Sequence, residues 1–483
     1  AEKIDKYNSY IENFNYDNSG KIGNINNYYY KEENIKCINS ILDQLILKTK
    51  FSEFNYKEMS TKIIEKGLDS KNKKDILINS FNNSSIALIM GEAGTGKTEL
   101  LCNYYVNIFK GMKILFISNT HTCKNNMIRR VKEKSEWYEE KYEAKTASSI
   151  SKNKYFFGEY DLVIIDECKS ISNRDINEIL KKINTKYLIL AGDIGQIDAI
   201  DLGNWFDIAA QMLDNKDIFV LTENYRTNSN ELRNVWEKVR NKEADTLEYL
   251  LKNNYIEMIN SNIFNKTSDD EIILCLNYNG TFGITSINSY FQNQNPHEAV
   301  KNNLDCYKVG DPVVFNENAN NKELYGEYLY NNLKGIIRKI VVNGEYLEFE
   351  IKVETYIPLS EMNVISSNKE EDWSIIKVKF KKYVDKPEDE NEEEYQSPFA
   401  VTYALSIHKA QGLEYSSVKI IITPEGEEKI NNRVFYTAIT RAKDNLKIYL
   451  TRNNQENMLN ILTEKDDRKD VELLKIIRGD TNV

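Results

Sequence analysis

The 483-residue sequence lacks the features that mark membrane and secreted proteins. It has no apolar run of eighteen or more residues, which is about the length that a membrane-spanning helix needs. Its first residues, AEKIDKYNSYIENF, contain no apolar core of the kind that a secretory signal requires. The six cysteines show no paired short spacing, so neither a zinc site nor a disulfide framework is indicated. We therefore expect a cytoplasmic protein that does not associate with a membrane.

An excess of positive charge is also lacking, because the formal net charge is −10. This balance excludes a protein coated in basic surface, but a local groove can still hold a nucleic-acid strand. Hydrophobic residues make up 41% of the chain and charged residues 29%, which is ordinary for a globular protein. The length allows two to four domains.

Short apolar runs, separated by polar segments compatible with helices, begin after residue 84. Runs of this kind are typical of buried parallel strands in an α/β domain. The first series lies at residues 86–90, 114–117, 162–165, 187–191 and 218–221. The second series lies at residues 272–276, 418–422 and 446–450. The pattern predicts two α/β lobes with parallel sheets.

A stretch of different character, residues 305–382, interrupts the second series. It alternates apolar and polar residues in four runs, at 312–315, 335–342, 346–353 and 375–380. Alternation with intervening turn residues predicts a small β-barrel inserted into the second lobe. The acidic run at 387–394, PEDENEEE, is predicted to be a solvated loop.

The strongest motif is IALIMGEAGTGKTELL, which fits the phosphate-binding pattern G-x-x-x-x-G-K-[ST] between a strand and a helix. Its backbone N–H groups can surround the β-phosphate of a nucleotide, aided by the helix dipole. Lys97 would reach the β- and γ-phosphates, and the Thr98 hydroxyl would hold Mg²⁺. The predicted nucleotide-binding residues of this loop are Gly91, Glu92, Ala93, Gly94, Thr95, Gly96, Lys97 and Thr98.

Polar groups at the ends of two later strands would complete the catalytic site. In YDLVIIDECKS, Asp166 would bind Mg²⁺ and Glu167 would polarise the attacking water. In YLILAGDIGQIDAI, Gln196 could sense the γ-phosphate and help to orient that water. Taken alone, the first pair could be a helix cap and the second motif a β-turn.

Two arginines offer planar, permanent charge for the phosphate during hydrolysis. Arg226 stands in LTENYRTNSNEL beside Tyr225, and Arg441 stands far away in NNRVFYTAITRAKDNLKIYL. Taken alone, Arg226 could be a surface arginine in a segment that leads into a helix. A finger from a second lobe is what a two-lobed ATPase needs, and such fingers accelerate hydrolysis by about 10³–10⁵.

The ordered series GEAGTGKT, NTHT, VIIDE, GDIGQ, NYRT, HKAQGLEY and YTAITRA resembles the motifs of superfamily 1 helicases. It covers residues 84 to about 450, and seven motifs in this order are very specific. The segments INSYFQNQNP, YKVGDPVVFNEN and LYNNLKGIIRKI resemble the RecD-like and Dda-like branch, superfamily 1B. The resemblance implies two RecA-like P-loop lobes, a barrel inserted in the second lobe, and 5′→3′ movement on single-stranded nucleic acid.

The resemblance also implies roles for individual residues. Tyr225 would stack on adenine, Glu414 would approach the ribose or the inter-lobe nucleotide site, and Arg226 and Arg441 would contact the γ-phosphate. The residues implied to face the strand are Asn119, Thr120, His121 and Thr146 in the first lobe and His408 in the second.

Three departures from the family pattern stand out. No clear glutamine precedes the P-loop where the family reads adenine, and GDIGQIDAI lacks the usual Leu-Pro-Pro. Only about twenty residues separate Thr146 from the Asp166 strand, which leaves little room for a strand-separating hairpin. Translocation is therefore better supported than efficient unwinding.

The predicted domains follow from these motifs. Residues 1–80 would form a mostly helical N-terminal extension, and residues 456–483 a helical C-terminal tail. The first lobe would span 81–225, the second 226–304 and 398–455, and the inserted barrel 305–397.

We interpret the chain as an ATP- and Mg²⁺-dependent translocase or helicase on single-stranded nucleic acid, with DNA favoured over RNA. One alternative is a nucleic-acid-gated regulatory ATPase that recruits a partner, such as a nuclease in a defence system, with residues 1–80 as the docking segment. Another is a P-loop NTPase unrelated to nucleic acid, against which the second arginine motif and the barrel insert argue.

Overall fold

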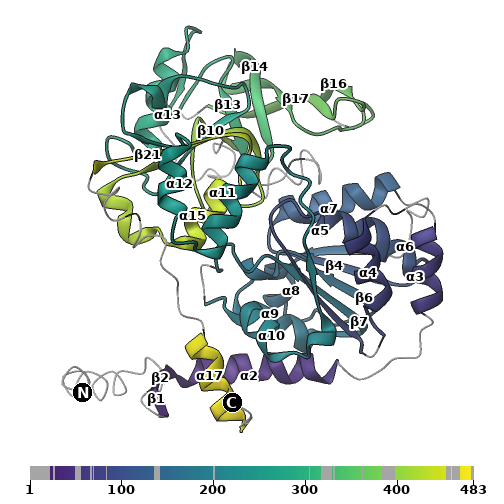
Figure 1. Ribbon diagram of the computed structural model, residues 1–483. Coiled ribbons are helices and arrows are strands. Elements are labelled where there is room, and N and C mark those ends of the chain that lie inside the picture. Colours follow the sequence, from purple (N-terminus) through teal and green to yellow (C-terminus); the bar gives the residue numbers. More distant parts are fainter. Residues whose placement is uncertain are drawn as a thin grey trace. The chain divides into compact units, whose positions relative to one another are not determined.

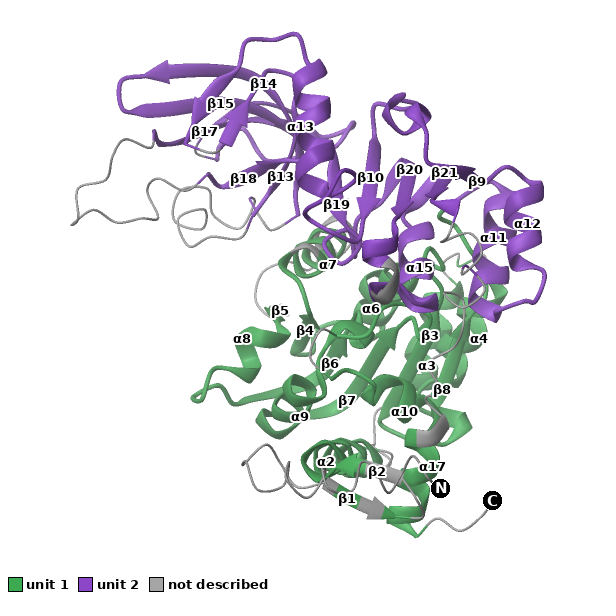
Figure 2. Ribbon diagram, turned by 90° about the vertical axis from the view of Figure 1, so that its left-hand side faces the viewer, with its two compact units in different colours: residues 1–226, 465–483 green, residues 227–464 purple. Residues whose placement is uncertain are grey.

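The computed structural model divides into two compact units, residues 1–226 with 465–483 and residues 227–464 (Figures 1 and 2). The residues that it describes are 22–25, 28–48, 56–65, 68, 70–82, 84–134, 142–199, 202–303, 305–316, 329, 332–361, 363–382, 397–452, 458 and 468–479. The predicted acidic loop at 387–394 lies outside these residues, as does most of residues 1–21 and 453–467.

Unit 1 is built on a six-stranded parallel sheet with the order β5-β4-β6-β7-β3-β8. Its strands are β3 (Ile86–Gly91), β4 (Ile114–Ser118), β5 (Tyr142–Thr146), β6 (Gly158–Ile165), β7 (Ile183–Gly192) and β8 (Ile218–Leu221). The inner strands are almost wholly buried, as near-continuous apolar runs predict for a sheet covered on both faces.

Helices cover both faces of this sheet. One apolar core lies under α3 (Tyr56–Glu65), α4 (Lys71–Asn79), the π-helical η1 (Leu100–Tyr105), α6 (Val106–Ile108) and α7 (His121–Lys134). The other lies under α2 (Glu32–Leu47), α8 (Ala147–Ser151), α9 (Asn173–Lys182) and α10 (Trp205–Met212). The shorter elements are α5 (Lys97–Glu99), η2 (Cys168–Ser170) and η3 (Asn215–Asp217).

The described segments near the two ends of the chain, within residues 22–48 and 468–479, pack against the rest of unit 1. Helix α2 buries one face on the second core and shares a smaller cluster with α10 and with α17 (Arg468–Arg478). Arg478 pairs with Asp43 at 2.9 Å, and Figure 1 shows α17 beside α2. A two-stranded antiparallel sheet, β1 (Ile22–Ile25) with β2 (Tyr28–Lys31), precedes α2. Helices α2, α3 and α4 therefore contribute to the core of the first lobe.

Unit 2 contains a five-stranded parallel sheet with the order β19-β10-β20-β21-β9. Its strands are β9 (Ile256–Met258), β10 (Glu271–Cys275), β19 (Ala404–Ser406), β20 (Tyr415–Ile422) and β21 (Ala442–Leu450). Its helices are α11 (Asn230–Asn241), α12 (Thr246–Lys252), η4 (Ser261–Phe264), α13 (Ile284–Gln294), η7 (Pro424–Lys429) and α15 (Asn432–Ile439).

The insert in unit 2 is an antiparallel sheet with the order β16-β17-β15-β14-β13-β18. Its strands are β13 (Pro312–Phe315), β14 (Lys334–Asn343), β15 (Tyr346–Val353), β16 (Val364–Asn368), β17 (Trp373–Lys381) and β18 (Phe399–Val401). The short pair β11 (Val300–Asn302) and β12 (Asp305–Tyr307) precedes it. One face packs into a core of apolar side chains, which is consistent with the predicted barrel.

The two parallel sheets share one topology. Reading β9, β10, β19, β20 and β21 as counterparts of β3, β4, β5, β6 and β7 reproduces the strand order of unit 1, which adds β8 at its edge. The loop after β10 thus corresponds to the loop after β4, and the loop after β19 to the loop after β5. The fold class predicted from the sequence, two RecA-like lobes with an inserted β domain, is confirmed. Among the described residues, no helix is both long and apolar enough to cross a membrane.

Candidate nucleotide and nucleic-acid site

The P-loop joins the end of β3 to α5, as the motif predicts. Gly94 and Gly96 have φ values of +83° and +78°, a region that residues with a Cβ rarely adopt. A Cβ at Gly94 would lie only 2.3 Å from the Cβ of Arg226. The loop therefore needs glycine at Gly94 both for its curvature and for its close contact with the Tyr225–Arg226 segment.

Lys97 lies inside this loop, with only 8% of its surface exposed. Its Nζ donates to the backbone oxygens of Gly91 at 2.7 Å and Glu92 at 2.9 Å. A buried ammonium group held only by carbonyl oxygens can exchange them for phosphate oxygens, which carry full charge. The position fits the predicted contact with a nucleotide phosphate.

Thr98 and Asp166 meet at the carboxyl ends of β3 and β6. The Thr98 hydroxyl donates to Asp166 Oδ2 at 3.0 Å, and Asp166 is 3% exposed. Burial raises the pKa of Asp166, and the nearby Lys97 charge opposes that shift. One hydroxyl and one carboxylate are oxygen ligands of the kind that Mg²⁺ takes beside substrate phosphates and water. The residues present therefore fit a magnesium ion.

Glu167 follows Asp166 in a left-handed backbone conformation, with φ of +54°. Its N–H donates to Asp166 Oδ1 at 2.9 Å, and η2 begins at the next residue. Such a conformation is uncommon for a residue with a side chain, and it turns the chain sharply between strand and helix. This turn sets the direction of the Glu167 carboxylate.

Gln196 lies in the loop after β7, whose strand neighbours are β3 and β6. It is 4% exposed, and its Nε2 donates to Asp193 Oδ2 at 3.4 Å. Gly195 N–H donates to the other oxygen of Asp193 at 3.0 Å, so one buried carboxylate shapes the loop. The structure thus brings Gln196 to the same sheet edge as Asp166 and the P-loop.

The Tyr225–Arg226 segment lies on the P-loop. Tyr225 N–H donates to Gly94 O at 2.7 Å, and the Asn224 side chain donates to Ala93 O at 2.8 Å. The Tyr225 ring is 54% exposed, as a stacking surface for a base requires. Lys73, which the sequence gave no reason to select, places its Nζ 4.5 Å from the centre of this ring and pairs with Glu99 at 2.7 Å.

A second residue missed from the sequence is Lys169, which is fully buried. Its ammonium group pairs with Asp198 at 2.5 Å and also with Asp207 of α10. Lys169 thereby ties the turn after Glu167 to the loop after Gln196 and to a helix. In the sequence it looked like one more solvated lysine, because its two partners lie 29 and 38 residues further along.

We predict that Lys169→Met lowers the free energy of unfolding by about 3–5 kcal/mol, because it leaves the buried Asp207 and the half-buried Asp198 without their shared cation. Urea unfolding followed by circular dichroism measures this loss. Lys181→Met is the matched control: Lys181 is 50% exposed and pairs with Glu178, so its loss should cost less than about 1 kcal/mol. Equal unfolding midpoints for the two variants would contradict the role assigned to Lys169.

The predicted strand-facing residues of unit 1 lie at the carboxyl ends of β4 and β5. Asn119 donates from Nδ2 to Ser170 O at 2.9 Å, which connects it to the turn that follows Glu167. The Thr120 hydroxyl accepts from Cys123 N–H at 3.2 Å, where α7 begins at His121. Thr146 is 4% exposed and its hydroxyl caps α8, so the structure gives this residue a capping role.

In unit 2, the predicted residues follow β19. His408 as a whole residue is exposed, but the protein around its imidazole removes part of the water from the ring. This desolvation lowers the pKa of His408, which favours the neutral form at pH 7. Glu414 pairs with Lys443 at 3.3 Å, and its backbone oxygen accepts from Lys334 of β14 at 3.2 Å. Lys334 therefore links the insert to the segment that carries Glu414.

Arg441 is almost fully buried within unit 2, with 2% of its surface exposed. Its guanidinium donates to Thr437 O at 2.9 Å, Leu413 O at 3.2 Å and the Thr440 hydroxyl at 3.1 Å. Because the guanidinium is buried, Arg441 would have to become accessible before it could contact a phosphate. The sequence could not show this, because Leu413 is 28 residues away.

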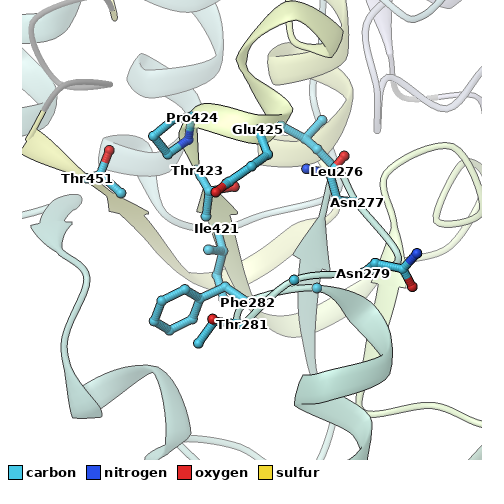
Figure 3. A pocket seen from close by; sticks show the side chains of 12 residues that line it. Leu276, Asn277, Asn279, Thr281, Phe282, Ile421, Thr423, Pro424, Glu425 and Thr451 are labelled. Carbon is cyan, nitrogen blue, oxygen red and sulfur yellow. The ribbon is translucent and has the colours of Figure 1, made fainter.

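A cavity of about 220 Å³ opens at the carboxyl ends of β10, β20 and β21 (Figure 3). Residues 276, 277 and 279–283, which lead into α13, form one wall, and Ile421, Thr423–Glu425 and Thr451 complete the lining. Asn277 at its rim accepts from Lys429 Nζ at 2.6 Å. This loop corresponds by topology to the loop after β4 that carries Asn119.

Among the described residues, no cluster of three or more His, Cys, Asp or Glu could hold a metal ion. A site with one carboxylate and one hydroxyl, completed by substrate, agrees with that finding. The fold and these residues together define a two-lobed P-loop ATPase.

Two family models match the chain: an AAA domain over residues 74–261 and a UvrD-like helicase C-terminal domain over residues 402–449. A similar curated protein is the RecBCD enzyme subunit RecD of Buchnera aphidicola subsp. Schizaphis graminum, 23% identical over 86% of this chain and 79% of its own. The uncharacterized protein MJ1519 of Methanocaldococcus jannaschii is 24% identical over 80% of this chain and 38% of its own.

Two solved structures share the fold. One is a Pif1 helicase structure described as DNA unwinding at forked double-stranded DNA, with a TM-score of 0.51 and 17% identity over 86% of this chain and 98% of that chain. The other is Bacteroides Pif1 bound to single-stranded DNA, with a TM-score of 0.51 and 15% identity over the same shares. With the ordered motifs, these matches support a superfamily 1B helicase of the RecD- and Pif1-like branch. It is an ATP-hydrolysing helicase or translocase.

Proposed function

We propose that this protein moves 5′→3′ along single-stranded DNA, with each step driven by Mg²⁺-dependent ATP hydrolysis. The observation that carries the proposal is the convergence of Lys97, Thr98, Asp166 and Gln196 at one edge of the first sheet, beside loops that suit a strand. The Pif1 neighbour bound to single-stranded DNA and the RecD relatives support DNA as the substrate.

The residues of unit 1 would divide the chemistry of hydrolysis. Lys97 and the P-loop N–H groups bind the phosphates, while Tyr225 offers its exposed ring to the base. Asp166 and Thr98 would hold Mg²⁺, which would supply charge that neutralises the phosphate oxygens. Glu167 orients the attacking water and accepts its proton. Arg226 and Arg441 stabilise the charge on the departing phosphate.

The strand would contact equivalent loops of the two lobes. Asn119, Thr120 and His121 follow β4 in the first lobe, and the polar loop 277–283 follows β10 in the second. Thr146 and His408 follow the corresponding strands β5 and β19. A stepping mechanism requires two separate binding sites on one strand, because the loops of one lobe can stay bound while the other lobe moves.

The structure places little between Thr146 and β6 that could split a duplex. This fully described stretch holds only α8 and a six-residue loop, 152–157. Lys182 donates to two backbone oxygens at the end of α8 and to Asn153 O in the loop. The short segment favours translocation over efficient unwinding. It also keeps a second candidate open, an ATPase gated by nucleic acid that recruits a partner protein.

Strand displacement from duplexes with either a 5′ or a 3′ single-stranded tail, with ATPase followed in parallel, tests the proposal. Displacement of streptavidin from one end of a single strand reports translocation when the duplex is not opened. We expect streptavidin to leave the 3′ end much faster than the 5′ end. Release from the 5′ end alone would reverse the polarity, and strand-stimulated ATPase without release from either end would favour the gated ATPase.

Asn119 should couple strand binding to hydrolysis, because its side chain bonds to the turn that follows Glu167. We predict that Asn119→Ala keeps the ATPase rate without DNA but lowers the DNA-stimulated rate by about two- to tenfold, the effect of one hydrogen bond worth about 0.5–1.5 kcal/mol. ATPase titrations with single-stranded DNA measure both rates. Asn79→Ala, which removes only a local bond to Asp75 O in α4, is the control. Equal stimulation in the two variants would contradict the coupling role.

A further inference from the structure

The outward face of the insert has an unusual composition. Along β15 and β17, alternate residues such as Phe349, Ile351 and Val378 point into the apolar core of the insert. The residues between them therefore point to the opposite face of the sheet. β14 pairs with β15 and β15 with β17, so the three strands present one continuous outward surface (Figure 2).

The strand register shows how charges are arranged on this surface. Lys377 lies opposite Glu350, Lys379 opposite Glu348, and Lys381 opposite Tyr346. Lys339 on β14 also lies opposite Glu350, and Lys352 completes the β15 row. Five lysines against two glutamates leave three net positive charges, whereas the whole chain carries −10. The surface is thus a basic patch on an acidic protein.

Both glutamates on this surface are already paired. Glu348 lies 2.7 Å from Lys377, and Glu350 lies 3.1 Å from Lys339. The lysine side chains remain open to solvent, with exposed fractions of 60% for Lys339, 48% for Lys377 and 47% for Lys379. Lys339, Lys377 and Lys379 are therefore accessible to a ligand in solution.

Two aromatic rings stand on the same surface, one toward each end of the β17 lysine row. Lys379 Nζ lies 3.9 Å from the centre of the Tyr346 ring, and Lys352 Nζ lies 4.6 Å from the Trp373 ring. Both rings are partly exposed. A solvated sheet face has no need of aromatic rings between its lysines, whereas a surface that binds single-stranded nucleic acid uses cations for phosphates and rings for bases.

We propose that this face, defined by Lys339, Lys352, Lys377, Lys379, Lys381, Tyr346 and Trp373, is an additional binding surface for single-stranded DNA. It holds a strand segment other than the one gripped by the loops after β4, β5, β10 and β19, through phosphate contacts along β17 and base stacking on Tyr346 and Trp373. This goes beyond the proposed function, since the surface contains none of the residues assigned to ATP or to the loops that grip the strand. A strand held here would lengthen the footprint of the protein on DNA.

The first test measures how the affinity for a long labelled oligothymidylate falls with salt. Lys377→Gln/Lys379→Gln/Lys381→Gln should reduce the slope of log Kd against log salt by about 2, since each phosphate contact on a single strand contributes about 0.7. Lys252→Gln/Lys266→Gln/Lys447→Gln removes the same charge elsewhere in unit 2 and should leave the slope unchanged. Equal slopes for the two triple variants would overturn the proposal.

The second test uses the intrinsic fluorescence of the full chain. Base stacking on Trp373 should quench its emission when oligothymidylate binds, and Trp373→Phe should remove that component while Trp205 and Trp236 stay buried in their lobes. Quenching that is identical in wild type and Trp373→Phe would overturn the stacking contact. DNA-stimulated ATPase, measured for the wild type and the same variants, separates the proposed function from the proposed surface. A wild-type ATPase that DNA does not stimulate would refute the motor, whereas the salt slope and the fluorescence quenching test only the binding surface.

Discussion

Glu167→Gln is expected to abolish measurable ATP hydrolysis while the protein still binds ATP. Glutamine keeps the size of the side chain and the sharp turn at φ of +54°, but it cannot accept the proton of the attacking water. Loss of a general base slows such reactions by about 10²–10⁴-fold. Phosphate release measures hydrolysis, and a fluorescent ATP analogue measures binding.

A second variant of the ATP site and a surface variant serve as controls for this result. Lys97→Ala should lose both ATP binding and hydrolysis, because Lys97 is the cation of the P-loop. Glu178→Gln, on the exposed surface of α9, should hydrolyse ATP at the wild-type rate. Normal turnover in Glu167→Gln or in Lys97→Ala would refute the assignment of the ATP site.

Arg441→Ala is expected to spare ATP binding and to reduce turnover by about 10³–10⁵-fold, the usual contribution of an arginine finger. The buried guanidinium makes three hydrogen bonds within unit 2, so truncation also leaves the oxygens of Thr437, Leu413 and Thr440 without their donor. Thermal unfolding must therefore accompany the kinetic measurement.

Arg441→Lys separates the two roles. It retains the charge but loses the forked geometry that binds two acceptors at once. If Arg441 is a finger, both variants turn over slowly at temperatures where both are folded. Normal turnover in a folded but less stable Arg441→Ala protein would show that the residue only supports the packing of unit 2.

Local sequence patterns sufficed to predict five of the six strands of the first parallel sheet and three of the five strands of the second. The runs at 86–90, 114–117 and 162–165 fall within β3, β4 and β6, because a strand covered on both faces is apolar throughout. The run at 346–353 matches β15, because alternation identifies a sheet with one buried face. The edge strand β5, YEAKT, was missed because its residues are mostly half-buried and polar.

Residues that act through distant partners could not be predicted in this way. Lys169 and Lys73 look like surface lysines until the fold buries one between two aspartates and places the other beside Tyr225. The motif order predicted where Thr98 and Asp166 lie, because parallel strands end at one edge of the sheet. It could not show that Arg441 bonds within its own lobe, since hydrogen bonds to backbone oxygens leave no trace in the sequence.

The measurement that most directly tests the central claim is the ATPase rate with and without saturating single-stranded DNA. We predict that DNA strongly accelerates hydrolysis, that Glu167→Gln abolishes this acceleration and that Asn119→Ala weakens it. A wild-type rate that does not change with DNA, in a protein that still hydrolyses ATP, would contradict a motor coupled to a nucleic-acid strand.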